Sequence, residues 1–120
     1  LYDHRPMNSQ LIRDLCLNTR RYQVSFINII QCALDIAPPI RANTDYIFIF
    51  RENTLSNRKR LYEDYASIFP SFNTFCQVLD QCTQNYECMV IDNTVHSDKI
   101  EDKIFWYKAE KRTDFTGFLF

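Results

Sequence analysis

The chain has 120 residues, of which 46% are hydrophobic and 15% aromatic, and its formal net charge is −1. This composition excludes a disordered polypeptide, because it supplies enough apolar material for a packed core. The balanced charge excludes a general nucleic-acid surface, and no apolar run approaches the roughly 18 residues of a membrane span. The single glycine, Gly117, excludes a glycine-rich phosphate-binding loop within these residues. We therefore expect one domain, or part of one.

Five cysteines lie mostly in apolar segments, which favours buried, reduced thiols in a cytosolic protein. The alternative is a zinc site made by Cys82, Cys88 and His96. The gap between the two cysteines is wider than the usual spacing of about two to four residues, and Cys88 begins a predicted strand. The spacing therefore favours buried thiols over zinc.

Two apolar runs organise the predicted fold, residues 24–31 (VSFINIIQ) and 45–53 (DYIFIFREN). Both are rich in β-branched and aromatic residues and are too short for a buried helix, which is typical of strands covered on both faces in a parallel sheet. We expect a helix over residues 7–20, a strand ending at Ile30, a short turn opened by Pro38-Pro39, and a second strand over 45–50. A right-handed parallel connection would join the strands.

The second half predicts two helices and two strands. The first helix runs to Phe69 after a cap at Ser56 or Asn57, and the second follows a cap at Ser71. Apolar strands follow at residues 87–91 and 103–109, the latter at a sheet edge because charges flank it. The order of elements indicates an α/β fold.

Several long runs together resemble one family: Arg20-Arg21-Tyr22, SFINIIQ, PPIRANTDYIFIFREN, NRKRLYEDYASIFPSFNTFCQVLDQCTQNYECMVIDN and KIEDKIFWYKA. They are similar to the C-terminal half of the genome-packaging ATPase of large cytoplasmic DNA viruses, the poxvirus-type branch of the FtsK–HerA P-loop superfamily. The resemblance covers residues 1–110 and leaves 111–120 as a tail. It implies that Leu1 falls just after the Walker B acids, so that both Walker motifs lie upstream.

The resemblance implies the C-terminal half of a RecA-like core, with a mostly parallel sheet flanked by helices. The parent protein would use ATP and Mg²⁺ to drive double-stranded DNA into the virion, as a homo-oligomeric, hexameric ring that meets other virion components. It would work in the viral factories of the host cytoplasm and in the virion. The fragment alone would be inactive, would bind neither cofactor tightly, and would expose an apolar edge and face.

The resemblance assigns roles to three residues. Gln31 corresponds to a polar sensor that bonds the γ-phosphate or the attacking water, and Arg20 and Arg21 are the candidates for an arginine finger that enters a neighbouring subunit's ATP site. Structural alternatives remain open. The amide of Gln31 could hydrogen-bond the backbone of a loop at a strand end, and Arg20 and Arg21 could be cations that stabilise a helix C-terminus.

Six further charged residues are candidates. Three of them lie around the second strand: Arg41, Asp45 and Arg51. We predict that they form a network at the nucleotide edge or between subunits, and ordinary surface ion pairs are an equal alternative. The other three form the basic triplet Arg58, Lys59 and Arg60. We predict that they bind DNA phosphates in the pore of a ring, although such triplets more often form a solvated helix face. A rival hypothesis for the whole chain is a non-catalytic binding or assembly module derived from the same fold.

Overall fold

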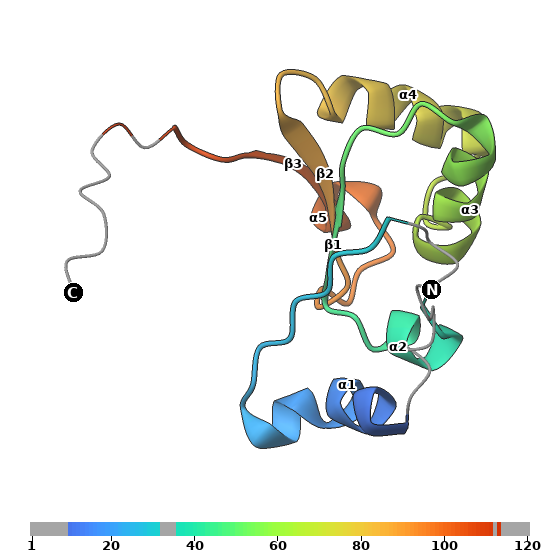
Figure 1. Ribbon diagram of the computed structural model, residues 1–120. Helices are drawn as coiled ribbons and strands as arrows, with labels where there is room; N and C mark the ends of the chain where they lie inside the picture. The colour runs from blue at the N-terminus through green and yellow to red at the C-terminus, as the bar shows by residue number, and fades with distance from the viewer. Residues whose placement is uncertain (1–9, 32–35, 112, 114–120) are drawn as a thin grey trace, which may run out of the picture.

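A computed structural model describes residues 10–31, 36–111 and 113 (Figure 1). The predicted tail, 111–120, falls almost entirely outside these residues, as do the first residues of the predicted N-terminal helix. In chain order the elements are α1 (Gln10–Tyr22), α2 (Pro38–Ala42), β1 (Tyr46–Ile49), α3 (Leu55–Tyr65), α4 (Phe72–Cys82), β2 (Glu87–Asp92), α5 (Ile100–Lys103) and β3 (Ile104–Lys108).

The three strands form one sheet in the order β1-β2-β3, and both pairs are antiparallel. The predicted mostly parallel, RecA-like sheet is therefore wrong for the described part of the chain. Two helices, α3 and α4, separate β1 from β2, and the last residue of β1, Ile49, pairs with Met89 near the start of β2. The chain thus enters β2 at the end of the sheet where it left β1, whereas a parallel connection would have returned it to the opposite end.

Residues 24–30, predicted as a strand beside β1, form no strand. The chain leaves α1 through Gln23, which has a positive φ of 53°, and then runs extended without joining the ladder (Figure 1). Ile27 and Ile29 are 86% and 91% exposed. The apolar character of this run predicted burial, but a strand also needs another strand to pair with, and no described strand pairs with residues 24–30.

The helices agree better with the sequence. α1 confirms the predicted N-terminal helix, and α2 replaces the short turn expected after Pro38-Pro39. Ser71 is the N-cap of α4 as predicted, and its hydroxyl oxygen accepts the backbone N–H of Thr74 at 3.1 Å. The predicted cap of α3 at Ser56 or Asn57 is wrong, because Thr54 occupies the N-cap and makes no side-chain cap bond. The short helix α5 was not predicted.

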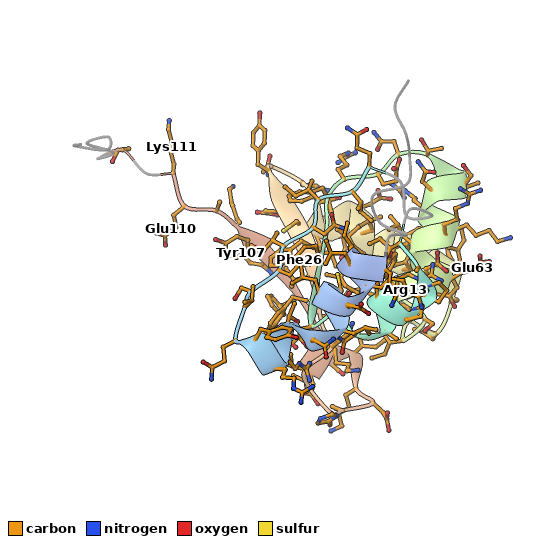
Figure 2. All side chains as sticks on the ribbon, turned by 60° about the horizontal axis from the view of Figure 1, so that its bottom comes forward. Arg13, Phe26, Glu63, Tyr107, Glu110 and Lys111 are labelled. Carbon is orange, nitrogen blue, oxygen red and sulfur yellow. The ribbon has the colours of Figure 1, made fainter. Side chains whose placement is uncertain are left out.

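The core lies between one face of the sheet and the pair α3 and α4. Phe75 of α4 is at its centre, with ring centroids 5.5 Å from Phe69 and 5.9 Å from Tyr62. The fully or almost fully buried members of this cluster are Ile49, Ala66, Phe69, Phe75, Leu79, Met89 and Ile91. β2 is the central strand and β3 lies at an edge, as its flanking charges predicted. Beyond β3 the chain runs away from the sheet through Glu110 and Lys111 (Figure 2).

No helix in the described ranges is long and apolar enough to cross a membrane.

The cap at Ser71 gives a direct test of the α4 assignment. Ser71→Ala should lower the free energy of unfolding by about 1 kcal/mol, because it leaves the N–H of Thr74 without its acceptor. Urea denaturation followed by circular dichroism measures this loss. Ser56→Ala is the matched control and should cause no loss, since that serine lies within α3 and is exposed. An equal loss in both variants would contradict the assignment.

Candidate functional site

An ion pair joins the end of α1 to the residue before β1. The guanidinium of Arg20 donates to the carboxylate of Asp45, and the two side chains are 71% and 42% exposed. A second link between the same elements is the side-chain amide of Asn43, which donates to the carbonyl oxygen of Cys16 at 2.9 Å. An exposed ion pair contributes little to stability. The pair with Asp45 nevertheless holds the predicted finger residue, Arg20, in a defined position that solvent can reach.

Asn93, which follows β2, fixes the other side of Asp45. Its backbone N–H donates to the Asp45 carbonyl oxygen at 2.8 Å, and its side-chain amide donates to the carbonyl oxygen of Thr44 at 3.1 Å. The sequence placed Asn93 after a strand but could not name its partners. Because the strands are antiparallel, the end of β2 returns to the start of β1, and this is why Asn93 and Asp45 meet.

A second arginine, Arg41 of α2, borders a hollow of about 440 Å³. Its guanidinium lies 2.7 Å from the carboxylate of Asp64, with both side chains largely buried, and 5.9 Å from the ring centroid of Tyr65. The hollow is lined by Pro38, Arg41, Ala42, Ile47, Glu63, Asp64, Tyr65 and Asn93. Arg41 therefore belongs to a local pair with Asp64, and it does not pair with Asp45.

The hydroxyl oxygen of Tyr65 is buried and has no hydrogen-bond partner among the described residues. Burial raises the pKa of this phenol, and the nearby Arg41 only partly offsets that effect. The phenol therefore stays protonated at neutral pH. It is able to donate or accept a hydrogen bond beside the hollow, but it is not a base.

Arg58 has a structural environment and not a DNA-facing one. Its guanidinium forms a two-pronged pair with the carboxylate of Asp80 on α4, at 3.1 and 2.6 Å, and its Nε donates to the carbonyl oxygen of Glu52 at 2.6 Å. The side chain is only 11% exposed. These three bonds use the guanidinium edges that a phosphate would need, so the predicted DNA-binding role does not suit Arg58 in this conformation.

Glu52 organises the loop between β1 and α3. Its carboxylate accepts the backbone N–H of Thr54 at 2.8 Å and the side-chain amide of Asn57 at 3.1 Å. The bond from Thr54 is the main reason that the pKa of Glu52 lies below its usual range. The carboxylate thus orders the loop that leads into α3, while the N-cap residue Thr54 makes no side-chain cap bond. A polar residue after a strand was the only sequence signal for Glu52.

The other predicted residues are dispersed over the surface. Gln31 is exposed and follows a segment that forms no strand, so it is not at a strand end as predicted. Exposed side chains are also found at Arg21, Arg51, Lys59 and Arg60. The structure therefore brings together Arg20 and Asp45 from the predicted set, and adds Asn93, Asp64 and Tyr65 nearby.

The cysteines can be compared with the two predictions made for them, buried thiols and a zinc site. Burial raises the pKa of Cys16, Cys82 and Cys88, so these thiols are poor nucleophiles at neutral pH. Cys32 lies outside the described residues. Within the part of the chain that the structure describes, no three His, Cys, Asp or Glu side chains gather closely enough to hold a metal ion, and this includes Cys82, Cys88 and His96.

Comparison with known proteins finds relatives in large DNA viruses. An uncharacterized protein of Acanthamoeba polyphaga mimivirus is 44% identical over 103 residues, which are 86% of this chain and 36% of that protein. An uncharacterized protein of Invertebrate iridescent virus 3 is 41% identical, covering 77% and 35% of the two chains. One of Frog virus 3 is 37% identical, covering 88% and 32%. The chain thus spans about a third of the length of the curated relatives it matches.

No family model matches the chain. No solved structure matches it either.

The Arg58 clamp should be a stability element. Arg58→Ala should lower the free energy of unfolding by about 1–3 kcal/mol, because it removes two charge-assisted bonds to Asp80 and one to the Glu52 carbonyl. Chemical denaturation measures the change. The matched control, Lys59→Ala, removes an exposed cation from the same helix and should change stability by less than about 0.5 kcal/mol. Equal stability of the two variants would contradict the structural role.

The same clamp should show in the pH dependence of stability. Arg58, through its hydrogen bonds, holds the pKa of Asp80 below its ordinary value of 3.8. The stabilisation is therefore fully present above about pH 4 and is lost as the pH falls through the lowered pKa. Thermal melts should show Asp80→Asn less stable than wild type at pH 7, with the difference narrowing below about pH 3. An exposed control, Asp98→Asn, should show no such pH-dependent difference.

Proposed function

We propose that this chain is part of a DNA-packaging ATPase of large DNA viruses. The observation that supports this proposal most is the resemblance of the long runs from Arg20 to Ala109 to the packaging ATPases of such viruses. The relatives of 37–44% identity are uncharacterized, and they add that proteins similar to this chain occur in large DNA viruses. The described sheet is antiparallel and not the mostly parallel sheet that the resemblance implies, so the fold gives this proposal no support.

The phosphate-binding loop of such an enzyme would lie outside these 120 residues. With one glycine, this chain has no material for that loop. The relatives match the chain over only about a third of their length, which leaves room for ATP, Mg²⁺ and the residues that bind them. The contribution of this chain would be the groups around the site: the finger, the sensor and the surface that meets DNA.

Arg20 fits the finger role better than Arg21 in one respect. It is already oriented by Asp45, yet 71% of its side chain is exposed, so a phosphate of a neighbouring subunit is able to compete with the Asp45 carboxylate for the guanidinium. In hydrolysis, water attacks the γ-phosphorus, the bond to the β-phosphate oxygen breaks, and ADP and phosphate leave. A guanidinium stabilises the charge that develops on the transferred group.

The sensor and DNA-binding assignments remain with exposed residues. Gln31 is accessible at the end of the extended segment, where its amide is able to reach a phosphate or a water. Lys59 and Arg60 remain available for DNA phosphates on α3, whereas Arg58 is engaged by Asp80. The duplex, the hexameric ring and a location in viral factories and virions belong to the same proposal.

ATP turnover of the full-length mimivirus relative, measured with and without duplex DNA, tests the proposal. Replacing the residue aligned with Arg20 by alanine should lower turnover by about 10³-fold or more, because a finger contributes roughly 10³–10⁵ in rate. The control is alanine at the residue aligned with Lys99, an exposed cation at the start of α5, which should leave turnover unchanged. Undiminished turnover after replacement of both Arg20 and Arg21 counterparts would remove the finger assignment.

The second candidate is a non-catalytic binding or assembly module. It is favoured by the lack of a phosphate-binding loop in the chain and by the apolar surface described below. A full-length relative that hydrolyses no ATP, with or without DNA, would establish this reading against the enzyme.

A further inference from the structure

The sheet has a second face that no described helix covers. Residues alternate along each strand, so the neighbours of the core residues point to the opposite side. We call this side the outer face: Tyr46 and Phe48 of β1, Val90 of β2, and Phe105 and Tyr107 of β3. Its four aromatic side chains are between 45% and 52% exposed, whereas Val90, in the middle, is fully buried.

The aromatic side chains on the outer face make a continuous apolar surface. The rings of Phe48 and Tyr107 come from the two edge strands and meet edge to face, with centroids 6.5 Å apart, although β2 lies between their strands. Phe48 and Phe105 are also the direct cross-strand neighbours of Val90 on either side. These contacts explain how Val90 is buried without a covering layer. The outer sides of the rings remain in contact with water.

A second apolar surface is the extended segment 24–30. Phe26, Ile27 and Ile29 are 41%, 86% and 91% exposed. Exposed apolar side chains gathered in this way, β-branched and aromatic, mark an interaction site in many proteins. The labelled Phe26 can be followed in Figure 2.

The edge of β1 lacks the features that protect a free strand edge. β1 reads YIFI, with no charge and no proline, and its only neighbour in the described sheet is β2. The other edge strand, β3, ends in Lys108 and follows Lys103, and charges of this kind discourage pairing. The two edges are therefore not equivalent, and the unprotected one carries two of the four aromatic side chains of the outer face.

We propose that the outer face, the free edge of β1 and segment 24–30 together form a docking surface for an apolar segment of the same polypeptide, from the part that the relatives carry outside the matched region. The chain spans only 32–39% of the length of these relatives, so about two thirds of their sequence is available to supply it. The proposal holds for whichever reaction the longer protein carries out.

A tethered segment is favoured over a second copy of the chain. Linking two binding surfaces in one polypeptide gives an effective concentration of about the millimolar range, whereas a second copy must associate from dilute solution. The aromatic part of the surface is apolar, and the carboxylate of Asp92, on the same side of the sheet, already accepts the backbone N–H and the hydroxyl of Thr94. An apolar layer therefore covers the rings without leaving this charge unpaired. In the longer protein the surface would therefore be filled before a second copy arrives.

Hydrogen exchange measured by mass spectrometry tests this proposal on two proteins, the 120-residue chain and the full-length mimivirus relative. Backbone amides of Ile27, Ile29 and the free edge of β1 should exchange rapidly in the short chain. The aligned amides of the full-length protein should exchange at least about 100-fold more slowly. The control is the turn around Tyr86, which is fully exposed and should exchange rapidly in both proteins. Equally rapid exchange of the docking surface in both proteins would overturn the proposal.

A matched pair of variants separates docking from self-association. In the short chain, Phe48→Lys should lower the melting temperature slightly, because Phe48 packs against Tyr107 and Val90, whereas Tyr86→Lys should leave it nearly unchanged. In the full-length relative, the counterpart of Phe48→Lys should lower it by several degrees more than in the short chain, and the counterpart of Tyr86→Lys should again have no effect. Light scattering supplies the remaining outcome: a full-length dimer that Phe48→Lys converts to monomers would show that a second copy occupies the surface, and would overturn the proposal.

Discussion

The described structure depends on one packing arrangement, the burial of a single face of a three-stranded sheet under α3 and α4. Phe75 and Leu79 of α4 are fully buried against Met89 and Ile91 of the central strand, and this apolar contact is the main source of stability. The Arg58–Asp80 pair then fixes α3 and α4 relative to each other at one end of this core. Because only one face is covered, everything attached to the other face or to the sheet edges is held by weaker, mostly polar contacts.

The sequence predicted the elements in this core well, because local signals and burial agree there. The Ser71 cap, the apolar spacing of α4 and the flanking charges of β3 are all local features, and each prediction was confirmed. Strand direction is not a local feature. An apolar run such as β2 is buried on both faces here without a parallel sheet, since its neighbours' aromatic rings cover one side. Two successive predicted helices between β1 and β2 were the one available sign of an antiparallel return.

The site residues were harder to predict than the fold, because their partners are remote in sequence. Arg20 and Asp45 are 25 residues apart, Arg58 and Asp80 are 22 apart, and Asn93 and Thr44 are 49 apart. A pattern identifies a charged residue near a strand, but not which charge will neutralise it. The basic triplet illustrates this: Arg58 is occupied by Asp80, while its neighbours Lys59 and Arg60 are exposed. Neighbouring basic residues in one helix therefore differ in burial and pairing, which the sequence pattern does not reveal.

The attachment of α1 connects the candidate site to the uncovered surface. Among the described residues of α1, Cys16 is buried, and polar contacts of Arg20 with Asp45 and of Asn43 with the Cys16 carbonyl help to join the helix to the rest. Few buried apolar contacts imply low local stability. Segment 24–30 continues directly from α1, so a layer that packs on this segment also restricts the helix. If the proposed docking takes place, the position of Arg20 would be set from two sides, by Asp45 and by the segment that covers residues 24–30. The guanidinium would then respond to docking, which an arginine on a fully packed helix would not do.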